Sequence, residues 1–458
     1  MAGIGFELRQ LLKNDSFFGM LRTYVYAGII SSGPWVISIL AMLFLGIFSL
    51  SFSSAPKWQI TQFQTSVTYL IAGSLIFTGL VQLAFTRYIA DQLYNKLYDT
   101  IFADFLGLLL ITTTITSIVA SIIDWFFFNS QTIPYQILMV GSFIILCNIW
   151  VTTILLSGLK KYKSIVFAFF ISYGLIIILG MQLKNYGLIG LLLAFFSGNL
   201  LLLVLVIYAI AKEYSWSKKI SFAFFNVKKI YWSLVITGIL YNLGLWADKF
   251  IFWYNPYTSH LIIGPLRASA LYDLPIFLAY LSIIPGMAIF LIRMETDFVE
   301  YYQKFFKYIL EGGSLALICE MRINMMLVAR QGILEIIKIQ AVAVMVIFVI
   351  GPTLLTYLNI SPLYLYLLNI DVVSAGLQVI FLALINVLFY LDKRTHALLL
   401  TLLFTIANIC LTQLSINLGP HFFGYGFAVA LLITVSTGMY VLNEDFLNFE
   451  YETFMLRG

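Results

Sequence analysis

Ionisable and amide side chains stand inside or beside long apolar stretches of this chain. The stretch 230–254 carries an asparagine near its middle and an adjacent acid and base about one turn from its far end. An arginine and an aspartate follow around the start of the next apolar stretch. Such groups are costly at membrane depth, so they usually face a bundle interior, a partner or a water-filled pathway. The candidate transport and gating residues are therefore Asn242, Asp248, Lys249, Arg267 and Asp273.

The pairing of these charges has two interpretations. Adjacent residues on a helix do not face each other, so we expect Asp248 and Lys249 to pair with other residues. We expect Arg267 to pair with Asp248 or with Asp273. The pair either holds together the hairpin between the two stretches, or forms a gate or polar patch in a translocation path.

Asp371 and Pro34 are further candidates in other apolar stretches. Asp371 lies about two turns into the stretch 363–391 and has no obvious basic partner. An acid at that depth either exchanges protons or is a hydrogen-bonded structural residue. Pro34 follows two serines in the first stretch, where a proline removes a backbone hydrogen bond and kinks the helix. A kink suits a transporter helix that bends, although some such prolines are purely structural.

The apolar stretches that must position these residues dominate the chain. It has 458 residues, of which 61% are hydrophobic and only 10% charged. Soluble proteins are about 25% charged, so this composition is typical of a polytopic membrane protein. We predict twelve transmembrane helices. They lie near 25–50, 61–85, 101–124, 135–157, 164–183, 186–211, 230–254, 268–292, 336–358, 363–391, 397–416 and 421–442.

The positions of lysine and arginine predict the orientation. If the N-terminus is cytoplasmic, nearly all of the 26 basic residues fall at cytoplasmic ends and loops. The four exceptions are Lys57, Lys184, Lys249 and Arg267. Both termini are therefore predicted to be cytoplasmic. The net charge of +5 is explained by this asymmetry and does not indicate a nucleic-acid partner.

A weak internal repeat suggests two six-helix halves. An arginine followed four residues later by an aspartate closes the second predicted helix and the eighth. Such matching positions in halves of one orientation fit a parallel duplication. The four residues are candidates for a cytoplasmic gate, or else they form interfacial ion pairs one helical turn apart. They are Arg87, Asp91, Arg293 and Asp297.

Two charge-rich segments and the N-terminus complete the predicted domain organisation. An interfacial amphipathic helix at 1–22 precedes an N-terminal bundle at 23–211, a basic cytoplasmic linker at 212–229 and a C-terminal bundle at 230–458. The second bundle contains an amphipathic cytoplasmic insertion at 293–335. This insertion is interpreted either as a hairpin lying on the membrane surface or as a docking platform for a cytosolic partner. Its candidate docking residues are Tyr301, Tyr302, Phe305 and Phe306.

Enzyme and metal signatures do not occur in the sequence. There is no glycine-rich phosphate loop of the Walker type, and the three histidines are isolated from one another. The three cysteines are scattered and suggest neither a disulfide framework nor a metal site. We therefore predict no catalytic residues, no cofactor and no metal.

Several long motifs resemble one family. They include MAGIGFELRQLL, YAGIISSGPW, YNLGLWADKFIFWY and FEYETFML, which are spread over most of the chain. The sequence is similar to the PelG family, the inner-membrane transport component of the bacterial Pel exopolysaccharide machinery. The resemblance implies the MATE-like fold of the multidrug/oligosaccharidyl-lipid/polysaccharide (MOP) exporter superfamily, an all-α polytopic protein with two six-helix bundles. No established site residues come with it.

The resemblance also implies a substrate and partners. The expected function is export of an N-acetylgalactosamine-rich polysaccharide across the bacterial cytoplasmic membrane, for biofilm matrix formation. The implied partners are a cytosolic PelF-like glycosyltransferase, PelD-like and PelE-like membrane proteins, the nascent polysaccharide and the lipid bilayer. One alternative is a proton- or sodium-coupled exporter of small molecules, drugs or lipid-linked oligosaccharides. A membrane-embedded polymerase is disfavoured because the predicted outer loops are short.

Overall fold

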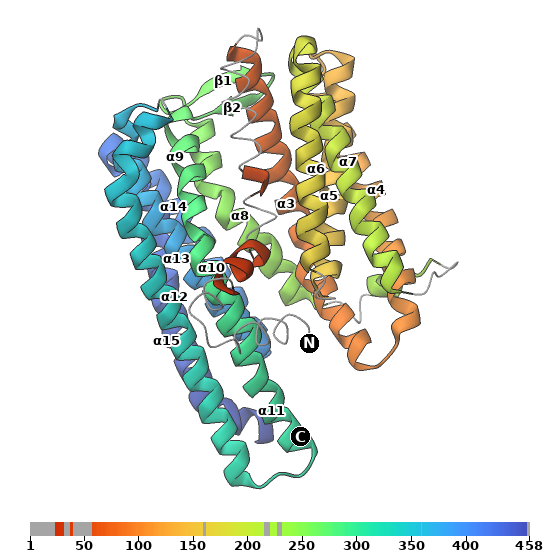
Figure 1. The fold of residues 1–458 in the computed structure, drawn as a ribbon, viewed down its shortest axis with the longest axis vertical. Coiled ribbons are helices and arrows are strands. Elements are labelled where there is room, and N and C mark those ends of the chain that lie inside the picture. The colour runs from red at the N-terminus through yellow and green to blue at the C-terminus, as the bar shows by residue number, and fades with distance from the viewer. Residues whose placement is uncertain are drawn as a thin grey trace. The chain divides into compact units, whose positions relative to one another are not determined.

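The computed structural model describes residues 23–31, 37–39, 57–158, 162–214, 220–226, 231–358 and 360–455. Pro34 and the predicted interfacial helix 1–22 lie outside these residues, as does most of the first predicted transmembrane stretch. Ten helices in the described part are long and apolar enough to cross a membrane. One of them, Lys163–Glu213, contains two predicted stretches joined by a short 3-10 turn. The predicted all-helical polytopic fold is confirmed (Figure 1).

The chain forms two compact units. One unit comprises residues 34–270. Its described residues form six long helices and a two-stranded hairpin: α3 (Lys57–Tyr94), α4 (Tyr98–Phe127), α5 (Ile133–Gly158), α6 (Tyr162–Leu183), α7 (Gly187–Glu213), α8 (Trp232–Tyr254), β1 (His260–Ile263) and β2 (Leu266–Ala268). The strands pair antiparallel, with Leu261 opposite Arg267.

The other unit comprises residues 1–33 and 271–458. Besides the helical residues 23–31, it holds α9 (Ala270–Tyr280), the 3-10 turn η4 (Leu281–Ile283), α10 (Ile284–Ile292), the π-helix η5 (Arg293–Phe298), α11 (Val299–Leu310), α12 (Leu315–Tyr357), α13 (Leu365–Tyr390), α14 (Arg394–Leu418) and α15 (Tyr425–Met455). Short 3-10 turns, η6 (Pro362–Tyr364) and η7 (Pro420–Phe422), precede α13 and α15.

Helix α8 belongs by its contacts to the unit that contains α3. It was predicted to open the second bundle, which was to begin at 230. The contacts instead divide the chain at Gly33 and at Ala270. The predicted bundles are defined by the order of helices along the chain, whereas the two units are defined by contacts. The boundaries of the bundles therefore stay a prediction.

Helices α11 and α12 form a hairpin. Each is part of a helical segment long enough to span a membrane, Ala270–Leu310 and Leu315–Tyr357. Helices α10, η5 and α11 follow one another without a loop (Figure 1). A turn at Gly312, whose φ is +71°, leads into α12, which runs unbroken for 43 residues. In this hairpin α11 extends the helix that precedes it, and the two interpretations of 293–335, a hairpin on the membrane surface or a docking platform, stay predictions.

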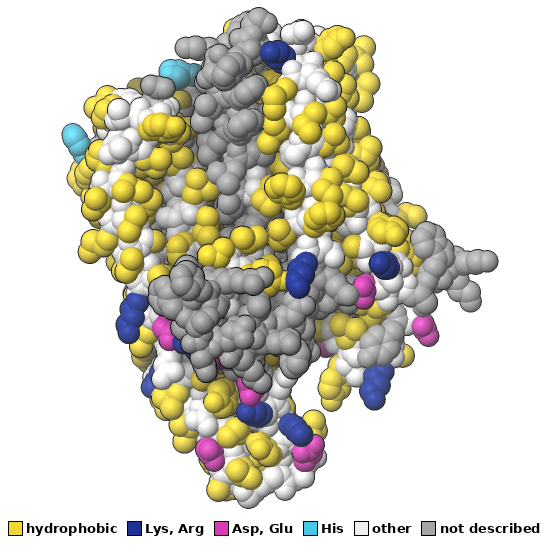
Figure 2. Space-filling model, in the orientation of Figure 1, with side chains coloured by type: hydrophobic (Ala, Val, Ile, Leu, Met, Phe, Trp, Pro, Cys, Tyr) yellow, Lys and Arg dark blue, Asp and Glu magenta, His cyan; other side chains and the backbone are white. Residues whose placement is uncertain are grey.

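Hydrophobic side chains cover much of the visible face of both units. In the unit that contains α11, Figure 2 shows the Lys, Arg, Asp and Glu side chains of the visible face toward the end where α11 lies, with hydrophobic side chains among them. A helix that is apolar around most of its circumference, with charges confined to its end, is typical of a membrane-spanning segment.

Candidate functional site

Two glycines allow α3 and α8 to pack backbone against backbone. A Cβ placed on Gly238 would lie 2.2 Å from the carbonyl oxygen of Gly79, and one on Gly79 would lie 2.6 Å from that of Gly238. Small residues permit such close helix packing in membranes. Asn242, one of the predicted transport residues, lies beside this crossing and donates its amide to the Gly238 carbonyl oxygen at 3.0 Å.

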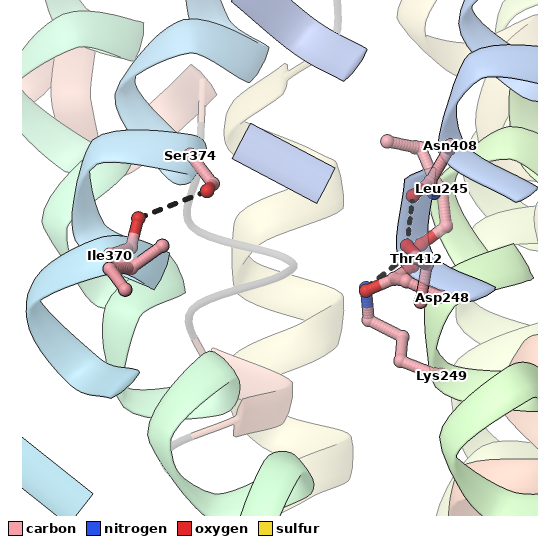
Figure 3. A network of polar contacts seen from close by, with 7 residues as sticks. All are labelled: Leu245, Asp248, Lys249, Ile370, Ser374, Asn408 and Thr412. Atoms are coloured by element: carbon pink, nitrogen blue, oxygen red, sulfur yellow. Dashed lines mark hydrogen bonds and ion pairs between the residues drawn. The ribbon is translucent and has the colours of Figure 1, made fainter. Parts of the chain in front are cut away.

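Asp248 and Lys249 form a buried ion pair with each other two turns farther along α8. The Lys249 Nζ lies 3.0 Å from Asp248 Oδ2 and 3.2 Å from Oδ1, and donates to the Leu245 carbonyl oxygen at 2.9 Å (Figure 3). Asp248 is 0% and Lys249 1% exposed. The prediction that the two would pair elsewhere is wrong. The flexible four-carbon lysine chain curls back along its own helix, which the rule for neighbouring side chains does not consider.

In the dyad of Asp248 and Lys249, each buried charge has an oppositely charged partner and at least one hydrogen bond. Lone buried charges are unstable, whereas paired and hydrogen-bonded ones are tolerated. The Lys249 ammonium also lies 5.9 Å from the ring centroid of Trp246, close enough for a cation–π contact. The two opposite charges of the pair therefore balance each other. The dyad is thus a buried, hydrogen-bonded ion pair within a helix of membrane-spanning length.

Within its own unit, Arg267 is held by backbone and hydroxyl oxygens. Its Nε donates to Ser259 Oγ at 2.9 Å and to the Trp253 carbonyl oxygen at 3.2 Å, and its Nη2 donates to the Ser259 carbonyl oxygen at 3.2 Å. The predicted pair with Asp248 is therefore wrong. The alternative partner Asp273 lies on α9 in the other unit, and that pairing stays a prediction.

The β1–β2 hairpin is fastened to α3 by side chains. The Tyr69 hydroxyl donates to the Arg267 carbonyl oxygen at 2.9 Å, and Gln62 donates to the Ile262 carbonyl oxygen at 3.3 Å. The Tyr69 ring stacks on Trp253 with centroids 4.5 Å apart. The sequence indicated polar residues at this connection but not strands, because four- and three-residue strands leave little periodicity.

The repeated arginine–aspartate motif forms an ion pair in both units. In α3, Arg87 Nε lies 3.2 Å from Asp91 Oδ1. The Tyr231 hydroxyl, at the start of α8, donates to Asp91 Oδ2 at 2.8 Å. In the other unit, Arg293 Nη1 lies 2.7 Å from Asp297 Oδ2. The predicted one-turn ion pairs are thus present, and the gating role stays a prediction.

Arg293 has a second carboxylate partner that sequence reasoning missed. Its Nε and Nη2 donate to the two Glu335 oxygens at 2.6 and 2.8 Å, a bidentate arrangement that joins η5 to α12. In the same π-helix, Glu295 accepts from the Tyr390 hydroxyl at 2.9 Å and from Asn386 at 3.3 Å. π-helical turns often occur at functional sites. Here η5 links the α11–α12 hairpin to α13 through charged groups.

Replacing Arg293 by lysine is expected to weaken this junction. A lysine keeps the charge but loses the planar fork that binds Glu335 with two hydrogen bonds. Because these side chains are about one-third exposed, we expect a loss of only about 1 kcal/mol in unfolding free energy. Chemical denaturation of purified Arg293→Lys measures this, and Lys304→Arg on exposed α11 is the control. An unchanged stability would mean that water already compensates the pair.

Asp371 is buried in α13, as its position predicted. It is 1% exposed, and Gly424 at the start of α15 lies against it: a Cβ there would meet Asp371 Oδ1 at 3.2 Å. It is not the only buried acid in the described residues. Asp104 accepts from the Tyr88 hydroxyl at 2.7 Å, and Asp445 lies 3.0 Å from Lys393 Nζ.

The predicted docking residues of α11 differ in exposure. Phe305 is 0% exposed, and its ring packs on Phe449 of α15 with centroids 5.3 Å apart. Phe305 is therefore a core residue, and its prediction as a docking residue is wrong. Tyr301, Tyr302 and Phe306 are half-buried, and their docking role stays a prediction. The residues that face solvent at this end include Leu310, Glu311 and Leu315.

The fold is similar to solved transporters of one superfamily. An outward-facing multidrug resistance MATE family transporter of the MOP superfamily matches with a TM-score of 0.66 and 16% identity, over 96% of this chain and 98% of that one. A MOP superfamily transporter from Pyrococcus furiosus matches with a TM-score of 0.60 and 14% identity, over 93% and 96%. The lipid II flippase MurJ matches with a TM-score of 0.57 and 12% identity, over 93% and 90%.

The sequence matches one family model over nearly its whole length. No curated protein matches it. The model of the exopolysaccharide exporter (EPS-E) family PelG matches residues 1–454, nearly the whole chain. Identities of 12–16% to the solved transporters show a shared fold and no more. The chain therefore belongs to the PelG exopolysaccharide exporter family, with the MATE-like fold of the MOP superfamily.

Proposed function

We propose that this protein exports an N-acetylgalactosamine-rich, Pel-type exopolysaccharide across the bacterial cytoplasmic membrane for the biofilm matrix. The observation that carries the proposal is the family match over residues 1–454 on a chain of membrane-spanning helices. The placement of lysine and arginine supports cytoplasmic termini, so export runs from the α11 end of the helices to the opposite end.

We propose further that the protein is not itself an enzyme and receives the nascent polysaccharide from a PelF-like glycosyltransferase. PelD-like and PelE-like membrane proteins are the other proposed partners. The tip of the α11–α12 hairpin is the proposed docking surface for the glycosyltransferase. There Leu310 is 77% and Leu315 70% exposed, beside the charged pair Lys307 and Glu311. Exposed apolar residues rimmed by charges are typical of protein interaction sites.

Substitutions on the α11–α12 hairpin separate docking from folding. We expect Leu315→Glu to leave the unfolding free energy within about 0.5 kcal/mol, because the residue is exposed, while capture of the purified glycosyltransferase is lost. Phe305→Ala should cost about 3–5 kcal/mol, because it leaves a cavity against Phe449. Co-purification and thermal unfolding measure the two effects. Capture that survives both Leu310→Glu and Leu315→Glu would place the docking surface elsewhere.

Inverted membrane vesicles test the export proposal. Vesicles that contain the glycosyltransferase, with and without this chain, receive radiolabelled UDP-N-acetylgalactosamine, and an added glycan hydrolase digests unprotected polymer. If protection of the polymer needs this chain while total synthesis does not, the chain is the conduit. Equal protection without the chain would contradict the proposal. Loss of synthesis itself would make the chain an obligate part of the polymerising assembly.

A cation-coupled exporter is the second candidate, and the buried Asp371 favours it. A carboxylate that binds and releases protons or sodium during transport must be able to change its charge. Asp371→Asn keeps the size of the side chain and removes that ability, so this mechanism expects transport to stop. Glycan protection in vesicles, with and without a proton or sodium gradient, measures it. Unchanged, gradient-independent export by Asp371→Asn would contradict the mechanism.

A further inference from the structure

Two tyrosines from different helices join their hydroxyls at the end of the 271–458 unit that lies opposite α11. The Tyr366 hydroxyl, at the start of α13, lies 2.9 Å from the Tyr425 hydroxyl, at the start of α15. The rings lie with centroids 6.3 Å apart and planes tilted by 49°. Phe422 adds a third ring 6.2 Å from Tyr425, tilted by 56°. We call Tyr366, Phe422 and Tyr425 the aromatic rim.

The aromatic rim is fixed by the backbone that carries it. Gly424 has a φ of +85°, a conformation that favours glycine, and a Cβ there would lie 2.7 Å from Leu367 Cδ1. This close approach seats the start of α15 against the first turn of α13, so Tyr425 meets Tyr366. The packing of α15 on α13 therefore fixes the positions of Tyr366 and Tyr425 in the absence of a ligand.

The aromatic rim is open to a ligand. Tyr366 is 50%, Phe422 46% and Tyr425 39% exposed. One hydroxyl–hydroxyl bond uses a single proton, so the pair still offers one donor and further acceptor lone pairs. The rings supply apolar faces beside these polar groups. The aromatic rim thus presents ring faces and hydroxyl groups side by side, two kinds of group that also line small-ligand sites.

We propose that the aromatic rim binds a pyranose ring of the exported glycan as it leaves the protein. A pyranose has an apolar C–H face, which stacks on an aromatic ring, and a rim of hydroxyls, which hydrogen-bond to the tyrosine pair. The segments around the rim, 352–366 and 416–426, contain no lysine or arginine. That makes this end the outer one by the distribution of positive charge. The proposal rests on the proposed function and names a binding site on the exit side.

Membrane anchoring is the competing role, because tyrosines also gather at lipid–water interfaces. An anchoring tyrosine turns its hydroxyl to headgroups or water and acts independently of its neighbours. Here the two hydroxyls bond each other across two helices, which fixes both rings at a set angle. Fixed ring positions favour the binding of a ligand of defined shape, whereas membrane anchoring does not need them.

Binding of a soluble sugar tests the site. The full chain is placed in lipid nanodiscs that contain no glycolipid and no maltoside detergent, and a short N-acetylgalactosamine oligosaccharide is titrated by calorimetry. We expect Tyr366→Ala and Tyr425→Ala each to weaken binding about tenfold, with a smaller loss for the phenylalanine variants. Tyr440→Ala and Tyr451→Ala are controls, because those residues are 68% and 62% exposed and lie 15 and 26 residues farther along α15 than Tyr425.

Each outcome decides the proposal. Loss of affinity at the rim variants alone supports it. It is overturned if the unaltered protein does not bind the oligosaccharide, if rim variants bind normally, or if the controls lose as much. The vesicle experiment with the same variants keeps the two proposals apart. Export by the unaltered chain without sugar binding at the rim contradicts only this inference, whereas absence of export contradicts the proposed function.

Discussion

Lys249→Met is expected to lower the unfolding free energy by about 3–5 kcal/mol, because it removes the ammonium that pairs with the fully buried Asp248 carboxylate. Methionine keeps the length of the side chain and fills the space, so the loss reports the charge and not a cavity. Asp248→Leu should cost a similar amount, because it removes the carboxylate that pairs with the buried ammonium of Lys249. Denaturant unfolding of the purified variants measures both.

The double variant Asp248→Leu with Lys249→Met distinguishes a structural dyad from a functional one. Replacing both partners of a buried ion pair by apolar residues is often neutral or stabilising, so most of the stability should return. If the dyad belongs to the translocation path, glycan export stays lost although the fold is restored. Recovery of both stability and export would make the pair purely structural. If either single variant lowers the unfolding free energy by less than about 1 kcal/mol, Asp248 and Lys249 do not form a buried ion pair.

Gly238→Ala is expected to separate α3 from α8 and to destabilise the protein by about 1–3 kcal/mol. The added methyl group would lie 2.2 Å from the Gly79 carbonyl oxygen, and backbone cannot move aside as a flexible side chain can. The change also displaces Asn242, whose amide bonds the Gly238 carbonyl oxygen. Export should therefore fall together with stability.

The matched control for Gly238→Ala is Gly174→Ala in α6. A Cβ on Gly174 meets nothing within 4 Å, so the same chemical change adds no clash there. In a helix interior alanine is favoured over glycine by about 1 kcal/mol, so the control should be neutral or stabilising. Thermal unfolding of the two variants side by side gives the difference. Equal effects would show that helix propensity, not the α3–α8 crossing, decides the outcome.

The membrane-spanning helices could be predicted from local sequence. A bilayer rewards long apolar runs and penalises charge wherever it occurs along the chain, so hydropathy acts residue by residue. The predicted stretches 135–157 and 363–391 accordingly correspond to α5 and α13 within a few residues. The arginine–aspartate pairs were predictable for the same reason, because their partners lie one helical turn apart.

Partners distant in the chain could not be predicted in this way. Glu335 binds Arg293 across 42 residues, and Phe305 is covered by Phe449, which lies farther still. Helical spacing indicated an apolar face on α11, but an apolar face can meet a partner protein, lipid or the chain's own next helix with the same spacing. Only the position of α15 decides that Phe305 faces inward.

The local sequence was enough to predict which segments are long and apolar enough to cross a membrane, and its motifs indicated the PelG family. Both signals can be read without knowing how the helices pack. The tertiary structure decided which polar residues meet. It placed Arg267 among carbonyl oxygens, brought Gly79 against Gly238 and joined Tyr366 to Tyr425. Hydrogen bonds and close packing need positions accurate to a fraction of an ångström, and only the packing of helices distant in the chain determines these positions.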